Sequence, residues 1–367
     1  MSPTWVIAVA LSALLSILLC ISPLILQVQL RNTAISVLIA SVLISNLLNF
    51  LNALIWPTED PTGLWQGQVL CDIEIKLRIG LDMTICGALT CVFRQLSSIV
   101  HPDHHALQPS RSQIRNTIIF EIIFCVILPT LRMMLSYVVQ PDRYWILGIY
   151  GCAPSVDTSW PSYALVLVWP FAVCLQSVWY GGLVLFRLAK RSRELSKLLP
   201  MGQAPGNERR TKKLFMMTLV LFCLNTPTRT YVFFVKLNKL SSLEPYSWSR
   251  VHPQDWAQRI IMIPFKPSVI PGYATNTASA IVVFFFLASG PEAVAMYKVW
   301  LAQMSSWVQW PRKWKHRSAP KTSQVASRGS IYRPDRNSAH ELEANWGFGR
   351  TRNAGVSRFG RYGLRRE

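Results

Sequence analysis

Several chemical features are missing from this sequence, and each absence excludes a modification or a class of protein. The 367 residues contain no Asn-x-Ser/Thr acceptor and no cysteine after Cys223, which excludes N-glycosylation of the sequence and palmitoylation beyond that residue. No nucleophile–base pair or metal-ligand set typical of an enzyme is present, and we expect the histidines of HPDHHALQP to be solvated. We therefore predict that the protein is not an enzyme and needs no metal, cofactor or nucleic acid.

Acidic residues are also scarce, with 18 Asp and Glu against 38 Lys and Arg, while 51% of the residues are hydrophobic. A net charge of +20 on so apolar a chain means that the basic and apolar parts are segregated. Runs of about 20 apolar residues, each long enough to cross a bilayer as a helix, recur along the chain. We predict seven, at residues 4–26, 34–55, 71–93, 117–139, 163–186, 214–235 and 268–289. The first could be a cleaved signal peptide, but MSPTW has no basic region, so we predict a retained helix.

The basic residues predict the orientation of these helices, because cytoplasmic loops carry the excess of Lys and Arg. The loops at 27–33, 94–116 and 187–213 hold 13 of them, whereas the loops at 56–70, 140–162 and 236–267 hold 6. The expected fold is therefore an all-α membrane protein, a seven-transmembrane helix bundle with its N-terminus outside and its C-terminus inside.

The third run differs from the others because it is charged, reading CDIEIKLRIGLDMTICGALTCVF. On a helix, Asp72 and Lys76 share one face, while Glu74, Arg78 and Asp82 line another at successive steps of four residues. A lone charge near the bilayer centre costs about 2.5 to 3.5 kcal/mol, so these side chains cannot face lipid. We expect them to face the bundle interior, a water-filled cavity or the outer headgroups.

Two arginines fall at a matching depth, Arg132 in the fourth run and Arg229 in the sixth. We predict a polar cavity open to the outside, with Asp82 opposite Arg132 or Arg229. The alternative is that the charges are buried ion pairs, or snorkelling arginines, that only fix helix packing. The candidate ligand-binding residues are Glu74, Arg78, Asp82, Arg132 and Arg229.

Six of the eight cysteines lie well inside the apolar runs, whereas Cys71 stands at the very edge of the third run and Cys152 lies between the fourth and fifth runs. Cys71 is at the outer end of the third helix and Cys152 is in the second outer loop, so both are on the oxidising side of the membrane. We predict a disulfide that ties this loop over the cavity, the alternative being two free thiols.

The chain resembles the a-factor-type fungal pheromone receptors, which are class D G-protein-coupled receptors. The resemblance covers roughly residues 4–297, and its blocks include SNLLNFLNALIWP, CDIEIKLRIG, LVWPFAVCLQSVWYGGLVLFRLAKR, FFFLASGPEAVAMY and, most specifically, LQPSRSQIRNTIIFEIIFCVILPTLRMMLSYVVQPDRYWILGIYGC. It implies a plasma-membrane receptor that binds a short prenylated peptide pheromone and signals through a heterotrimeric G protein. One departure is VFRQLSSI, which leaves Arg94 with a neutral neighbour where the family usually has a basic doublet.

A G-protein surface is expected on the inner side, where RLAKRSRELSKLLPMGQAPGNERRTKK reads as two helix extensions separated by a Pro/Gly break. Pro227 predicts a hinge in the sixth helix. The alternative for the charges is that they only set the topology. The predicted coupling residues are Arg94, Arg187, Lys190, Arg191, Arg193, Arg209, Arg210, Lys212 and Lys213.

We predict a receptor domain at 1–290, an amphipathic membrane-surface helix at 291–316 and a disordered basic cytoplasmic tail at 317–367. Two other functions stay open at this point. The chain could be a receptor-like relative without a mating role, or a seven-helix transporter, although no inverted repeat or pair of Gly-broken helices is present.

Overall fold

The computed structural model of the protein describes residues 3–100, 110–198, 206–237, 245–265 and 270–288, together with residues 294, 297 and 298. Long helical segments occupy all seven predicted positions. They are α1 (Pro3–Gln29), α2 (Thr33–Ile55), α3 (Gln68–Ile99), the run of α4 (Arg111–Ile122), η1 (Ile123–Ile127) and α5 (Leu128–Val138), the run of α6 (Trp160–Ser162), η2 (Tyr163–Leu167) and α7 (Val168–Leu198), α8 (Gly206–Leu237) and α10 (Ile270–Leu287).

Five of these segments are long and apolar enough to cross a membrane. They are Trp5–Gln29, Thr33–Ile55, Arg111–Val138, Trp160–Lys190 and Ile270–Leu287. The other two long helices, α3 and α8, are more polar. The α3 sequence carries five charges in its N-terminal half, and α8 begins with GNERRTKK.

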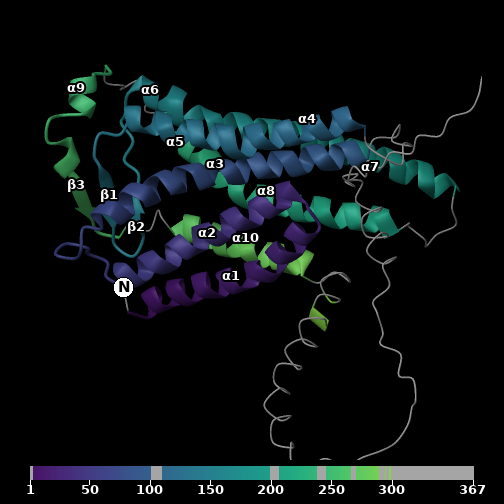
Figure 1. Cartoon of the computed structure of the whole chain (residues 1–367), viewed down its shortest axis with the longest axis horizontal. Helices are drawn as coiled ribbons and strands as arrows, with labels where there is room; N and C mark the ends of the chain where they lie inside the picture. Colours follow the sequence, from purple (N-terminus) through teal and green to yellow (C-terminus); the bar gives the residue numbers. More distant parts are fainter. Residues whose placement is uncertain are drawn as a thin grey trace, which may run out of the picture.

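The third helix lies at the centre of the bundle, where it packs against α2, α5, α7 and α8 (Figure 1). Its C-terminal half contributes to the main core, a cluster that contains Leu89 together with Ile39 of α2, Val184 of α7 and Leu221 of α8. By contrast, α1 packs mainly along α2 and α10 at the edge of the bundle. The N-terminal half of α3 therefore has other helices on several sides, and side chains such as Glu74, Ile75 and Met83 are buried there, whereas Val69 and Ile73 are exposed.

Two turns of π-helix interrupt the fourth and fifth long segments, each just before a proline. The N–H of Leu128 donates to the Ile123 carbonyl, and the N–H of Val168 donates to the Tyr163 carbonyl, five residues back in each case. Pro129 and Pro170 follow. Because proline has no N–H, it cannot donate to the carbonyl four residues before it, and a π-turn is one way for the helix to accommodate this.

The first π-turn packs directly on α3 because α3 carries a glycine there. A Cβ atom on Gly87 would lie 2.2 Å from the carbonyl oxygen of Phe124, which is a backbone atom that cannot move aside easily. Any larger residue at position 87 would push η1 away from α3. The glycine thus sets the distance between the third and fourth helices.

A small three-stranded sheet covers the end of the bundle at which α3 begins, so the all-α prediction missed this element. The strands are β1 (Tyr144–Leu147), β2 (Gly151–Ala153) and β3 (Ile260–Ile263). An antiparallel hairpin pairs Ile146 with Cys152, and β3 pairs parallel to β1 with Tyr144 opposite Ile260. The start of α1 packs at this same end, where Val9 and Ile149 share a cluster.

Short elements precede the third strand, namely α9 (Trp248–Val251) and η4 (Trp256–Gln258). The predicted membrane-surface helix at 291–316 and the predicted tail at 317–367 lie outside the described residues, apart from positions 294, 297 and 298. The Tyr297 hydroxyl and the Ser22 hydroxyl of α1 are 2.8 Å apart.

Candidate ligand-binding site

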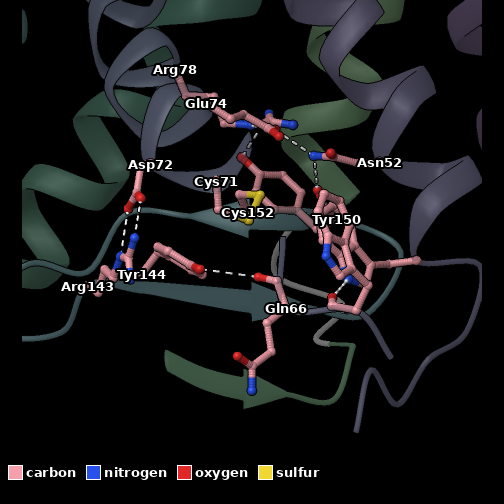
Figure 2. Close-up of a disulfide and its surroundings, with 12 residues drawn as sticks. Asn52, Gln66, Cys71, Asp72, Glu74, Arg78, Arg143, Tyr144, Tyr150 and Cys152 are labelled. Carbon is pink, nitrogen blue, oxygen red and sulfur yellow. Dashed lines mark hydrogen bonds and ion pairs between the residues drawn. A yellow bond between two sulfur atoms is a disulfide. The ribbon is translucent and has the colours of Figure 1, made fainter. Parts of the chain in front are cut away.

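A disulfide joins Cys71 of α3 to Cys152 of β2, the pairing that we expected from the sequence (Figure 2). The two Cα atoms are 5.2 Å apart, and both residues are fully buried beside Trp56 and Tyr144. The first turn of α3 and the hairpin are thereby held together.

An ion pair next to the disulfide strengthens the same junction. Arg143 donates from Nη2 and Nε to the two carboxylate oxygens of Asp72, at 2.5 and 3.0 Å, and from Nη1 to the Ala257 carbonyl at 2.9 Å. The hydrogen bonds with Asp72 raise the pKa of Arg143 above its ordinary value. Asp72 therefore binds the segment that leads into the sheet, through Arg143.

The first buried charge on α3 is Glu74, whose carboxylate faces α2. Its Oε1 accepts from Arg78 Nε at 2.7 Å and from Asn52 Nδ2 at 2.5 Å. Arg78 also donates to Asn49 Oδ1 at 3.2 Å, and its guanidinium lies 4.6 Å from the centre of the Tyr150 ring in the hairpin turn. The pair is thus enclosed by α2 and by the turn between β1 and β2.

The asparagines of α2 are site residues that our sequence analysis missed. Asn46, Asn49 and Asn52 recur at intervals of three within an apolar run, which places them on one face of the helix. Polar side chains in a membrane run are costly unless they are hydrogen-bonded, so this spacing was the signal that could have identified them. Asn46 donates to the Asn276 carbonyl of α10 at 3.2 Å.

Asp82 lies on α3, one helical turn after Arg78, and its carboxylate is placed between two arginines. Its Oδ2 accepts from Arg132 Nη1 at 2.8 Å, and its Oδ1 accepts from Arg229 Nε at 2.7 Å. We had expected Asp82 opposite one or the other arginine, and the structure places both against it. One carboxylate therefore links α3 to α5 and to α8.

The two arginines are held in different ways. Arg132 also donates to the Val166 carbonyl at 3.1 Å and to the Ile79 carbonyl at 3.0 Å. Val166 is four residues before Pro170, so its carbonyl lacks the helical donor that another residue would supply. Arg229 donates to the Asn225 carbonyl of its own helix at 2.5 Å.

The carboxylate between these arginines remains accessible. The Asp82 side chain keeps 36% of its surface exposed, against 10% for Arg132 and 15% for Arg229. Because Asp82 contacts α5 on one side and α8 on the other, this surface lies next to the ion network.

A second cation and an aromatic cluster lie beside the sheet. Lys76 donates to Ser136 Oγ at 3.0 Å and to Gln140 Oε1 at 2.7 Å, and it lies 5.8 Å from the centre of the Tyr137 ring. The His252 ring stacks on the Trp248 ring, with 4.1 Å between the ring centres, and its centre lies 4.8 Å from that of the Tyr137 ring.

The surroundings of His252 change the pKa of its imidazole. Its Nε2 lies 3.1 Å from the Tyr137 carbonyl. Burial lowers the pKa of His252 below its ordinary value, the hydrogen bond with the Tyr137 carbonyl acts against this, and Lys76 lowers the pKa further.

At the opposite end of the bundle, the predicted coupling residues Arg94 and Arg187 contact side-chain and backbone groups of other helices. The Arg94 guanidinium lies 4.2 Å from the centre of the Phe120 ring, and Arg187 of α7 donates to the Ser97 carbonyl near the end of α3. Lys190 and Lys212 are exposed. Lys213 is partly buried, and the remaining four coupling residues lie in helices with side chains outside the described set, namely Arg191 and Arg193 in α7 and Arg209 and Arg210 in α8.

Comparison with known proteins places this chain in a family. Residues 8–306 match the family model described as Pheromone A receptor. The chain belongs to the pheromone A receptor family. Together with the five apolar helices, this membership makes it a multi-pass membrane protein.

The relatives are fungal receptors of low sequence identity. The chain is 26% identical over 289 residues to the pheromone a factor receptor of Saccharomyces cerevisiae, an alignment that covers 78% of this chain and 60% of the relative. It is 28% identical over 278 residues to the pheromone B beta 1 receptor of Schizophyllum commune, covering 73% and 49%. Pheromone receptor 1 of Mycosarcoma maydis is 25% identical over 295 residues, covering 78% and 81%. The first two relatives therefore extend well beyond the part that this chain matches.

Proposed function

We propose that this chain is a G-protein-coupled receptor of the plasma membrane that binds a lipid-modified peptide mating pheromone outside the cell and activates a heterotrimeric G protein inside. Membership of the pheromone A receptor family and the names of the relatives support this proposal. The observation that carries it is the network around Asp82, in which an accessible carboxylate joins three helices near the end of the bundle that bears the sheet.

The proposed topology has seven crossings with the sheet outside the cell. It requires α3 and α8 to cross the membrane as well, with their charges turned toward neighbouring helices. The ion pairs of these helices support this topology. Glu74 pairs with Arg78 within α3, and Arg229 of α8 pairs with Asp82 of α3, so each charge meets an opposite charge inside the bundle. The disulfide also favours an outside location for the sheet, because disulfides persist in oxidising compartments.

In the proposed mechanism the pheromone is recognised by the side chains that converge beneath the sheet, namely Glu74, Arg78, Asp82, Arg132 and Arg229. Pro227 lies inside α8, two residues before Arg229, and would let the outer part of the helix bend relative to the inner part. Pheromone must bind one packing of α3 and α8 better than another to drive such a change. The inner ends of α7 and α8 would then rearrange for the G protein.

The test is a reconstituted exchange assay on the full chain in lipid nanodiscs. Synthetic candidate pheromone peptides from the same fungus would be added in farnesylated and unmodified form, and nucleotide exchange on the purified G protein would be followed. We expect acceleration by a farnesylated peptide only. A protein that moves a solute across vesicles but never accelerates exchange, at verified folding, would be a transporter, and the receptor proposal would be wrong.

A further inference from the structure

The network on α3 contains more positive than negative charge. Arg78 pairs with Glu74, whereas the guanidinium groups of Arg132 and Arg229 share the single carboxylate of Asp82. Nη2 of Arg78 is buried and has no hydrogen-bond partner among the described residues. Uncompensated charge inside a membrane bundle is unfavourable, so this network would be stabilised by one further anion.

The contacts of the two arginines at Asp82 show where that anion would go. Arg132 is fixed by two backbone carbonyls in addition to Asp82, one on η2 and one on α3. Among the residues that the structure describes, the hydrogen bonds of Arg229 outside its own helix both go to Asp82, to the carboxylate at 2.7 Å and to the carbonyl at 3.5 Å. If an incoming anion replaced Asp82 as the partner of one arginine, Arg229 would therefore lose fewer other contacts than Arg132.

The accessible surface of Asp82 provides the approach. With 36% of its side-chain surface exposed, Asp82 is more accessible than Arg132 or Arg229. A guanidinium binds a carboxylate well because its parallel N–H groups match the two oxygens. A cationic ligand group would instead meet the excess of arginines and be repelled.

We propose that Arg229 is the receptor's binding point for a carboxylate carried by the peptide ligand, and that Asp82 occupies this position until the ligand arrives. The proposal rests on the proposed receptor function and adds the chemical class of the group that the ligand must bring. When that carboxylate takes over Arg229, Asp82 stays with Arg132, and the link between α3 and α8 is released.

Acetate is the probe that tests this without pheromone or G protein. Two double variants of the full chain in nanodiscs are compared, Asp82→Asn with Arg132→Gln and Asp82→Asn with Arg229→Gln. Both lack the carboxylate and carry the same net charge, but they retain different arginines. Thermal unfolding is followed while sodium acetate replaces sodium morpholinoethanesulfonate at constant ionic strength, with a parallel series in chloride.

We expect acetate to raise the midpoint saturably, by about 3 °C, in the variant that retains Arg229 and to leave the variant that retains Arg132 nearly unchanged. Equal shifts in both variants, or none in the first, would overturn the proposal. An equal response to chloride would show a site for free inorganic anions and would overturn the assignment to a carboxylate.

If Asn at position 82 prevents folding, the same two arginine changes combined with Asp82→Ala supply a second pair, in which a hole takes the place of the carboxylate. Neither measurement uses signalling as its readout. A negative result therefore leaves the receptor function standing, while loss of the exchange activity described above would leave the acetate result intact.

Discussion

At the scale of single residues, Asp82 has the largest effect on the bundle because two arginines from different helices depend on it. Each guanidinium lies within 2.8 Å of one carboxylate oxygen, and both arginines are mostly buried. Removing one partner of such a group costs more than the group contributes, since an unpaired charge stays behind in a region that excludes water. The residue thus combines a structural role with the proposed recognition role.

Asp82→Asn should lower the free energy of unfolding by about 3 to 5 kcal/mol, which would appear as reduced surface expression and a lower thermal midpoint. Adding Arg229→Gln should recover expression because it leaves only Arg132, which keeps the Val166 and Ile79 carbonyls as acceptors, but the response to pheromone should stay lost. Asp72→Asn is the matched control on the same helix. Its pair with Arg143 is more exposed, so that change should cost only about 0.5 to 1 kcal/mol. Equal losses for Asp72→Asn and Asp82→Asn would contradict this interpretation of the network.

His252 predicts a pH dependence at the sheet-bearing end. Because the folded protein lowers the pKa of this imidazole, the unfolded loop binds a proton more readily, and the loop loses stability as the pH falls below roughly 6.5. The ring faces Lys76 and the aromatic side chains of Tyr137, Trp248 and Trp256, so a second positive charge there is unfavourable. The protection factors of the amides in residues 245–265, which correct for the slower intrinsic exchange at acidic pH, should fall between neutral and acidic pH. In His252→Gln this fall should disappear, and its persistence would assign the effect to another group.

At the scale of elements, the prolines act through the carbonyls that they leave without helical donors. Pro170 cannot donate to the Val166 carbonyl, and Arg132 from the neighbouring α5 supplies the missing hydrogen bond at 3.1 Å. A residue at one position on the fifth long segment therefore orients an arginine on the fourth, and through it Asp82 on the third. Prolines in these helices place side chains as well as bending the backbone.

A double-mutant cycle tests this link. Pro170→Ala lets the helix take back the Val166 carbonyl, so Arg132 should lose an acceptor and the change should destabilise the receptor by about 1 kcal/mol. In an Arg132→Gln background the same proline change should be neutral or stabilising, which gives a coupling energy of about 1 kcal/mol or more from thermal unfolding.

Pro23→Ala in α1 is the matched control for this cycle, since it also removes a proline from inside a helix. It lies in a helix that packs along α2 and α10, so its effect should simply add to that of Arg132→Gln. Additive behaviour of Pro170→Ala as well would disprove the link between Pro170 and Arg132.

At the scale of the whole molecule, the positions of the long helices and the partners of Asp82 could be predicted because hydropathy and helical spacing are local properties of the sequence. The sheet could not. Its strands Tyr144–Leu147 and Ile260–Ile263 are short and lie more than 100 residues apart, and no periodicity within either strand reveals a parallel partner that distant. The role of Asn52 was missed for a similar reason. Its partners, Glu74 and the Tyr150 carbonyl, come from two other segments of the chain.

The last prediction concerns the end of the molecule at which α8 begins. The start of α8, GNERRTKK, carries a cluster of basic residues, and Lys212 among them is exposed. We expect this cluster to attract an acidic surface of the G protein, so that neutralising it reduces activation by about tenfold while pheromone binding is unchanged. The variant replaces four residues with glutamine, namely Arg209, Arg210, Lys212 and Lys213.

The control for this variant removes the same number of charges from the C-terminal region, at Arg350, Arg352, Arg358 and Arg361. Nucleotide exchange and pheromone binding are then measured at matched surface expression. If only the α8 variant loses exchange, the position of the charges matters as well as their number. Unchanged exchange in the α8 variant at normal expression would refute the coupling role, whereas loss of expression in that variant alone would assign its charges to setting the topology, because basic residues next to a membrane helix hold that end inside.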